Sequence, residues 1–309
     1  MFRDIDKLIE RAYTQLRHQD LHGAIETLRQ ALTLDADNAH AHALLAICLH
    51  DQKRVHAAEY EARAALALNP EFPFAHYAMA IVSIAQRRFK LAEQHLNAAL
   101  ALDPGNPAML RSLAHLYGLW GRRREVLPLL EKARDAEPDD ADTWAALAEH
   151  HRDARDFKQA EVLALRALEI DPENADALLT MGYLLLARGE TQDAKEHALI
   201  VLRNNAVHAG AIQLLGAVKA RQSPLLGLWW RFNSFFGGGS MTRRVVLLIG
   251  IYLAYRASMI ALNDFGYQQA GTWAQFAWLG FCVYTWVGPA VFQKQLRKEL
   301  APASLSAKY

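Results

Sequence analysis

A fixed spacing of prolines is the feature that most constrains the fold of this 309-residue chain. Pro70, Pro104, Pro138 and Pro172 follow one another at intervals of 34 residues. The text around each proline repeats with it, as in LALNPEFPFA, LALDPGNPAM and LEIDPENADA. A repeat of this length corresponds to one supersecondary unit that cannot bury its apolar face alone, so neighbouring units must stack into one contiguous array.

Each repeat is predicted to form two helices, A and then B, because its residues are rich in the helix formers Ala, Leu, Glu and Arg. An acidic residue or asparagine beside the proline is expected to cap the next A helix, whose first turn tolerates Pro73 and Pro107. Pro128 lies inside the fourth B helix and is expected to shorten or bend its start. The predicted domain, residues 1–221, contains these units: 5–38, 39–72, 73–106, 107–140, 141–174 and 175–208, followed by a capping helix at 209–221.

Small residues recur at fixed positions of both helices. In helix A they are Ala12, Ala46, Ala80, Ala114, Ala148, Gly182 and Gly216. In helix B they are Ala24, Ala58, Ala92, Ala160 and Ala194, and, seven residues later, Ala31, Ala65, Ala99, Ala133 and Ala167. Helices that pack face to face need such notches for a neighbour's side chain, so these positions are predicted to lie at helix–helix contacts.

This pattern resembles the tetratricopeptide repeat over about residues 5 to 221. The resemblance rests on a bulky–small pair in helix A, two alanines in helix B and the terminal proline. The aromatic residue expected early in helix A is present only as Trp144; Leu8, His42, His76, Leu110 and Leu178 stand at the other positions. The resemblance implies an all-α solenoid of helix-turn-helix repeats that binds proteins or peptides in a concave groove lined by the A helices.

The repeat register predicts which side chains face this groove. They are His40, His50, Phe74, Tyr77, Arg111, His115, Glu149 and Arg152. Such a surface is amphipathic and mildly cationic, which suits a peptide with an acidic or C-terminal group. Ala145 is also predicted to face the groove, whereas Ala148 is predicted to face helix B.

Two apolar runs follow the repeats, Val245 to Leu262 and Thr272 to Phe292. As helices they would be roughly 27 and 31 Å long, close to the ~30 Å of a hydrocarbon core. The sequence therefore predicts a transmembrane hairpin over residues 243–292; a buried hairpin of a soluble protein is the alternative. Arg256 interrupts the first run and would either extend outward to the interface or pair with a partner protein.

The segment 222–242 is predicted to form an interfacial helix followed by a glycine-rich hinge. Trp229 and Trp230 beside Arg231 suit the headgroup layer of a membrane, although a cap of the solenoid would also explain them. Basic residues flank both apolar runs on their outer sides, so the tail 293–309 and the repeats are predicted to be cytoplasmic. The resulting expectation is a cell inner-membrane protein with two spans.

No catalytic motif, metal site or cofactor site is found in the sequence. The two cysteines, Cys48 and Cys282, cannot form a metal cluster and are read as small apolar residues. Lys and Arg number 34 against 33 Asp and Glu, so no overall field favours nucleic acid. The chain is therefore predicted not to be an enzyme.

The leading functional hypothesis is a membrane-tethered scaffold or adaptor that contacts membrane lipid and binds partner proteins or peptides in the groove. The alternative is a non-catalytic subunit of an integral-membrane enzyme or transport complex. In that case the hairpin and Arg256 would contact an integral-membrane partner.

Overall fold

The computed structural model describes residues 2–18, 20–206, 208–222, 241–264, 267, 269, 272–276, 278–280 and 282. The chain divides into two compact units, Met1–Thr180 and Met181–Tyr309. The elements described in both units are helical, which confirms the predicted all-α class.

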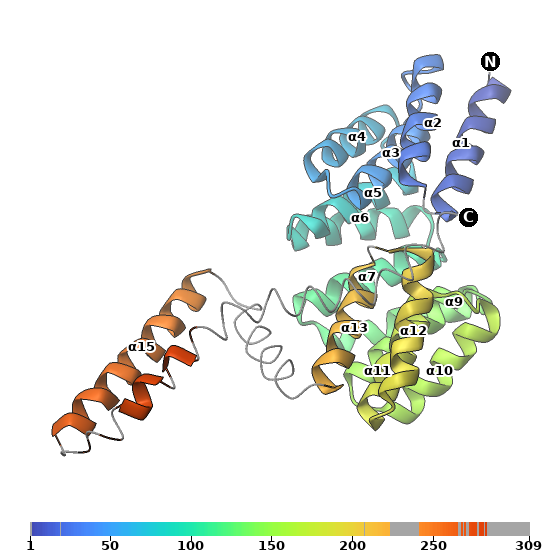
Figure 1. Ribbon diagram of the computed structural model, residues 1–309. Helices are drawn as coiled ribbons and strands as arrows, with labels where there is room; N and C mark the ends of the chain where they lie inside the picture. The colour runs from blue at the N-terminus through green and yellow to red at the C-terminus, as the bar shows by residue number, and fades with distance from the viewer. Residues whose placement is uncertain are drawn as a thin grey trace. The chain divides into compact units, whose positions relative to one another are not determined.

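The first unit is an array of helix pairs joined by short turns (Figure 1). The A helices of the array are α1 Phe2–Arg17, α3 Ala39–Asp51, α5 Pro73–Ala85, α7 Pro107–Trp120 and α9 Ala141–Asp153. The B helices are α2 Leu21–Leu34, α4 Val55–Leu68, α6 Phe89–Leu102, α8 Val126–Ala136 and α10 Phe157–Ile170. Each B helix packs on the A helix before it, and along the series α3, α5, α7 and α9 each helix contacts the next. The A helices therefore share one face of the unit.

Helix α11, Ala175–Arg188, contains the boundary between the two units. In the second unit, α12 Thr191–Asn204 packs on α13 Ala209–Gln222. Helix α15 spans Met241–Asp264, and the ring of Trp278 stacks on its Tyr255 with centroids 4.5 Å apart.

The small residues of the repeat lie where the packing argument places them. Ala46, Ala80 and Ala148 of the A helices are fully buried, as are Ala58, Ala92 and Ala160 of the B helices. In the second unit, a Cβ added to Gly182 would lie 2.3 Å from a methyl carbon of Leu214. These positions are close helix–helix contacts, as predicted.

Asparagines cap three A helices. The side-chain oxygens of Asn38, Asn106 and Asn174 accept hydrogen bonds from the backbone N–H three residues later, at 2.9, 3.2 and 3.0 Å. Pro73 and Pro107 are the first residues of α5 and α7, where proline has no hydrogen bond to lose. The boundary residues of these helices therefore behave as the sequence indicates.

Pro128 delays the fourth B helix, as predicted. Helix α8 has 11 residues, whereas α6 and α10 have 14. Proline has no N–H to donate to the carbonyl of Arg124 four residues earlier, and its ring would clash with that carbonyl. The chain instead forms a short 3₁₀ helix, η1 Arg123–Glu125, in which Glu125 N–H bonds the carbonyl of Arg122 at 3.1 Å.

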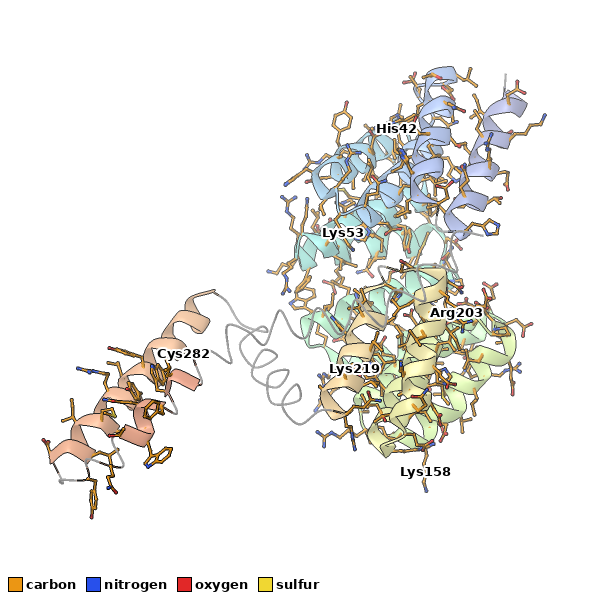
Figure 2. All side chains as sticks on the ribbon, viewed as in Figure 1. His42, Lys53, Lys158, Arg203, Lys219 and Cys282 are labelled. Atoms are coloured by element: carbon orange, nitrogen blue, oxygen red, sulfur yellow. The ribbon has the colours of Figure 1, made fainter. Side chains whose placement is uncertain are left out.

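The turn after each A helix from α3 onward contains one residue in the left-handed region of backbone conformation, and this residue recurs every 34 positions. These residues are Lys53 (φ 63°), Arg87 (φ 58°), Gly121 (φ 83°), Arg155 (φ 64°) and Gly189 (φ 96°). Figure 2 labels Lys53 at the turn between α3 and α4. Glycine adopts this conformation without a steric penalty, whereas an L side chain costs roughly 1 kcal/mol or more.

We expect Gly121→Ala to lower the free energy of unfolding by about 1 kcal/mol, because the added methyl group disfavours the positive φ. No atom lies within 4 Å of the added Cβ, so the effect would come from the backbone alone. Gly118→Ala is the matched control. Its Cβ is equally free of contacts, but Gly118 lies inside α7, so alanine should stabilise by about 0.5 to 1 kcal/mol. Urea unfolding of both variants measures the two shifts, and shifts of the same sign would contradict the assignment of the turn.

The predicted location in the inner membrane with two spans is wrong. Among the described residues, no helix is long and apolar enough to cross a membrane. The apolar run 245–262 lies in α15, where Arg256 is exposed and Asp264 is the last residue. A charge inside such a run is costly in hydrocarbon, and the sequence argument gave Arg256 too little weight. The expected lipid and integral-membrane partners rested on these spans and therefore have no support.

Several predictions fall on residues outside the described ranges. These include the interfacial helix with Trp229, Trp230 and Arg231, the glycine hinge, residues 283–292 of the second apolar run, and the tail 293–309.

Candidate functional site

A cavity of about 940 Å³ runs along the A helices of the first unit, and we call it the groove. Helices α3, α5, α7 and α9 provide most of its wall, η1 and the first part of α8 complete one edge, and Asp176 of α11 also lines it. Its apolar lining includes Ile81, Ile84, Gly118, Leu119, Val126, Leu130 and Ala146. Its polar lining includes His50, Tyr77, Arg111, Ser112, His115, Arg123, Arg124, Asp142, Glu149, His150, Asp153 and Asp176.

The structure brings five of the eight predicted groove residues together at this cavity. They are His50, Tyr77, Arg111, His115 and Glu149. The other three, His40, Phe74 and Arg152, are not part of its lining.

His40 and Phe74 belong to an aromatic cluster that joins the first three A helices. The ring nitrogen Nε2 of His40 lies 2.8 Å from the hydroxyl of Tyr13, and its ring centroid lies 5.7 Å from that of Phe74. The ring of Phe72 meets His40 edge-on at 5.6 Å. Burial lowers the pKa of His40, which favours the neutral ring at neutral pH. These side chains pack repeats together; neither the His40 ring nor the Phe74 ring is part of the groove lining, but Phe74 stacks on the groove residue Tyr77, with ring centroids 5.8 Å apart.

Arg152 is directed at two carboxylates of its own helix end. Its guanidinium lies 3.0 Å from Glu149 Oε1 and 2.9 Å from Asp153 Oδ1. Both of these carboxylates line the groove, so Arg152 compensates one of the two negative charges at this point of the wall.

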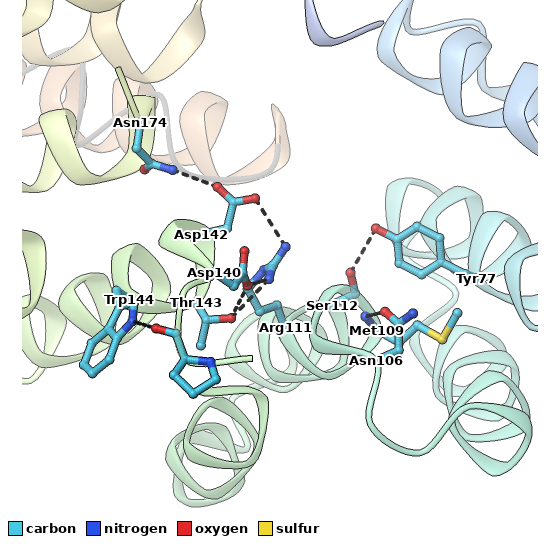
Figure 3. Close-up of polar contacts among 11 residues, drawn as sticks. Tyr77, Asn106, Met109, Arg111, Ser112, Asp140, Asp142, Thr143, Trp144 and Asn174 are labelled. Atoms are coloured by element: carbon cyan, nitrogen blue, oxygen red, sulfur yellow. Dashed lines mark hydrogen bonds and ion pairs between the residues drawn. The ribbon is translucent and has the colours of Figure 1, made fainter. Parts of the chain in front are cut away.

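Arg111 is held by an acidic network between α7 and α9 (Figure 3). Its guanidinium forms an ion pair with Asp140, donates to Thr143 Oγ1 at 3.1 Å and lies 3.3 Å from Asp142 Oδ2. The other carboxylate oxygen of Asp142 accepts a hydrogen bond from Asn174 Nδ2 at 2.8 Å. The charge of Arg111 is therefore already compensated, so the mildly cationic character predicted for the groove does not come from this residue.

The cationic part of the groove lies instead at the turn between α7 and α8, where three arginines follow one another. Arg122 is committed to the fold, because it bonds Glu93 Oε1 at 2.5 Å and places its guanidinium 4.0 Å from the ring centre of Tyr117. Arg123 and Arg124 form η1, are exposed and line the groove. Within the described part of the chain these two arginines form no ion pair.

Arg123 and Arg124 were not identified from the sequence as groove residues. Pro128 was the sequence feature that could have identified Arg123 and Arg124, because it changes the local backbone from an α-helix to a 3₁₀ helix.

His150 does not add to the positive charge at neutral pH. Burial, His151 and nearby Arg123 each lower its pKa below the ordinary value. The imidazole is therefore neutral at pH 7, and the uncompensated charge on this side of the groove belongs to Arg123 and Arg124.

The early histidines of the A helices have a structural role that also explains the missing aromatic residues. His42 Nε2–H donates to the carbonyl of Ala36 at 3.0 Å, and His76 Nε2–H donates to that of Pro70 at 2.9 Å. Trp144 Nε1–H makes the equivalent bond to Pro138 at 2.7 Å. Each ring thus ties an A helix to the turn six residues before it.

No group of three His, Cys, Asp or Glu residues in the described ranges could hold a metal ion. Burial raises the pKa of the Cys48 thiol to about 12, so it is protonated at neutral pH.

Family models for the tetratricopeptide repeat match residues 9–75 and 163–196. None of the curated proteins that were compared matches the sequence.

Solved structures with the same fold include a thermophilic tetratricopeptide-repeat protein of Thermus thermophilus. It is 19% identical, with a TM-score of 0.55, over 59% of this chain and 99% of that one. PilW, a type IV pilus biogenesis factor, is 19% identical with a TM-score of 0.52 over 68% of this chain and 98% of that one. The Cut9–Hcn1 hetero-tetramer of the APC/C gives 16% identity and a TM-score of 0.56 over 69% of this chain, which spans 42% of the matched chain.

Tetratricopeptide repeats generally mediate protein–protein interactions and are typically non-catalytic. The two family matches lie in the helix pairs described above, and the likeness to solved structures is one of fold. The chain therefore contains tetratricopeptide repeats, matched at residues 9–75 and 163–196.

Proposed function

We propose that the chain is a non-catalytic scaffold that binds a segment of a partner protein in the groove. The observation that carries this proposal is a cavity of about 940 Å³ shared by four consecutive A helices. That volume is at the upper end of the range for ligand sites, and a wall built from several successive helices suits a peptide segment.

The chemistry of the wall supports a peptide more than a small polar ligand. Ile81, Ile84 and Ala146 offer apolar surface, and Leu119 is 53% exposed at the edge. Burying such surface drives association, while polar groups around it fix orientation. In the Cut9–Hcn1 structure an array of this fold assembles with another protein, which is consistent with this use of the fold.

Ala146→Trp tests the proposal, because the indole would fill the groove next to α7. The half-buried position accepts a larger side chain without entering the helix–helix contacts that Ala148 makes. Arg111 is a poor choice for this test, since its removal would release Asp140 and disturb the α7–α9 contact.

The purified full-length chain would first be used to select binders from a phage library of random peptides of about 12 residues. Fluorescence polarisation then compares the affinities of the selected peptides. We expect Ala146→Trp to weaken binding at least about tenfold, which is about 1.4 kcal/mol. Ala101→Trp, at an exposed position of α6 outside the groove, should bind as the unmodified chain does. Failure to enrich any peptide, or equal binding by both variants, would count against a peptide site in the groove.

A further inference from the structure

The geometry points to a specific partner chemistry: the peptide segment that enters the groove carries acidic side chains that pair with Arg123 and Arg124. This inference rests on the proposed function and concerns the charge of the partner. It places the acidic residues of the segment at the edge formed by the α7–α8 turn.

Among the repeats of the first unit, the local backbone places two arginines at the groove edge only in the fourth, just before helix α8. The equivalents of Arg123 at the starts of α4, α6 and α10 are Val55, Phe89 and Phe157, which are the first residues of regular α-helices. In the fourth repeat, Pro128 moves the start of the α-helix to Val126, so Arg123 and Arg124 lie in η1 at the groove. Two adjacent guanidinium groups thus stand where other repeats begin a helix.

Among the described residues, Arg123 and Arg124 are the arginines of the groove lining that form no ion pair. Among the groove carboxylates, Asp142 pairs with Arg111, and Glu149 and Asp153 pair with Arg152. Asp142 and Asp176 also stand in the first turns of A helices, whereas η1 follows the C-terminal end of α7. A segment that crosses the groove therefore meets the carboxylates of Asp142 and Asp176 at one edge and two guanidinium groups without an ion pair at the other, where Glu149 and Asp153 are paired with Arg152.

Arginine suits this role because its planar guanidinium donates two parallel hydrogen bonds to a carboxylate. Only two free arginines stand beside several carboxylates, which would repel a polyanion such as a nucleic acid that needs many phosphate contacts. The apolar wall beside η1, with Leu119 and Leu130, favours a mixed acidic and apolar peptide. Charge complementarity therefore selects an acidic peptide as the occupant.

The test repeats the peptide selection with the full-length double variant Arg123→Glu/Arg124→Glu. For the unmodified chain we expect peptides enriched in Asp and Glu; for the double variant we expect enrichment in Lys and Arg. An acidic peptide selected on the unmodified chain should bind the double variant at least about tenfold more weakly. Its affinity for the unmodified chain should fall as NaCl rises from about 0.05 M to about 0.5 M, because exposed charges are screened.

The control is the exposed pair Lys132→Glu/Lys158→Glu, which makes the same change in net charge outside the groove. Lys158 points away from the body of the array (Figure 2). The control should keep the preference for acidic peptides, and circular dichroism should show the same helicity for all variants. Both arginines are exposed, so their replacement should not prevent folding.

The outcomes separate this inference from the proposed function. If selected peptides are excluded by Ala146→Trp but show no excess of acidic residues, the groove binds peptides and the acidic partner is refuted. An acidic preference that survives Arg123→Glu/Arg124→Glu also refutes the pairing. If no selected peptide responds to Ala146→Trp, the proposed function itself fails.

Discussion

Replacing Ala148 with leucine is expected to lower the free energy of unfolding by about 1 to 3 kcal/mol. Ala148 lies in α9 with no exposed surface, and Ala160 of α10, the helix packed on it, is equally buried. The three added heavy atoms have no free volume, so either the side chain adopts a strained rotamer or the two helices separate.

The loss should spread from α9 to its neighbours. In a repeat array, each unit is stabilised by its own packing and by its two nearest interfaces. Hydrogen exchange should therefore show lost protection in α7 to α10 before α1 to α4. Ala146→Leu is the matched control, because that position of the same helix is half-buried and lines the groove. Equal effects of the two substitutions would mean that Ala148 is not at the α9–α10 contact.

Replacing Glu59 with alanine is expected to cost about 2 to 3 kcal/mol at neutral pH, because hydrogen bonds to charged groups contribute about 1.5 to 3 kcal/mol. The side chain of Glu59 is only 9% exposed. Its carboxylate accepts hydrogen bonds from Gln86 Nε2 at 2.6 Å and Arg88 Nη1 at 2.9 Å, and it also pairs with Arg63. These bonds tie α4 to the turn between α5 and α6, so their loss leaves Gln86 and Arg88 without this acceptor.

The same carboxylate predicts a pH dependence. The hydrogen bond from Gln86, helped by Arg88 and Arg63, lowers the pKa of Glu59 below its ordinary value. A carboxyl with a lowered pKa stabilises the fold above its unfolded pKa, and the effect is lost as pH falls through the folded pKa. The stability difference between the unmodified chain and Glu59→Gln should therefore be constant near neutrality and shrink under acid conditions.

Urea unfolding at several pH values measures this difference. Glu26→Gln is the control, since Glu26 is 52% exposed and pairs with Arg29 one helical turn away. Pairs of this kind contribute less than about 0.5 kcal/mol. A Glu59 effect as small as that of Glu26 would show that the carboxylate does not link the repeats.

The helix contacts could be predicted from the sequence because the steric demand for small residues is local and recurs with the repeat. The residues that face the groove were harder to predict. Ala145 was predicted to face the groove but has no exposed surface and packs with Ala167 and Ala177. An A helix inside an array contacts its own B helix and the helices of both neighbours, so only a narrow strip remains exposed. The alanine of α9 that lies in this strip and lines the groove is Ala146, one position after Ala145.

Register alone also could not decide the role of a large side chain. Ala108 and Asp142 occupy the same repeat position as His40 and Phe74 and line the groove. His40 instead contacts Tyr13 and Phe72, and Phe74 contacts Phe72 and stacks on the groove residue Tyr77. At one repeat position, the size of the side chain therefore affects whether the residue lines the groove.

Part of the charge pattern was predictable from the repeat. Glu59 bonds Arg88, and one repeat later Glu93 bonds Arg122 across the same interval. A search for charge pairs that recur at the repeat length would have found these two ion pairs. It would have assigned no such partner to Arg123 and Arg124. The ion pair of Arg111 with Asp140 has no such counterpart, because it depends on how closely α7 and α9 approach.

The late start of α8 makes one segment of the array, residues 107–140, different from its neighbours. Its cause, Pro128, and its result, the turn with Arg123 and Arg124, lie within a single period of the sequence. Because each unit of such an array contacts only the units beside it, a segment of this kind is a transferable module. Grafted into a regular array of consensus repeats, it would carry its two free guanidinium groups with it, and its insertion point would set where an acidic ligand docks.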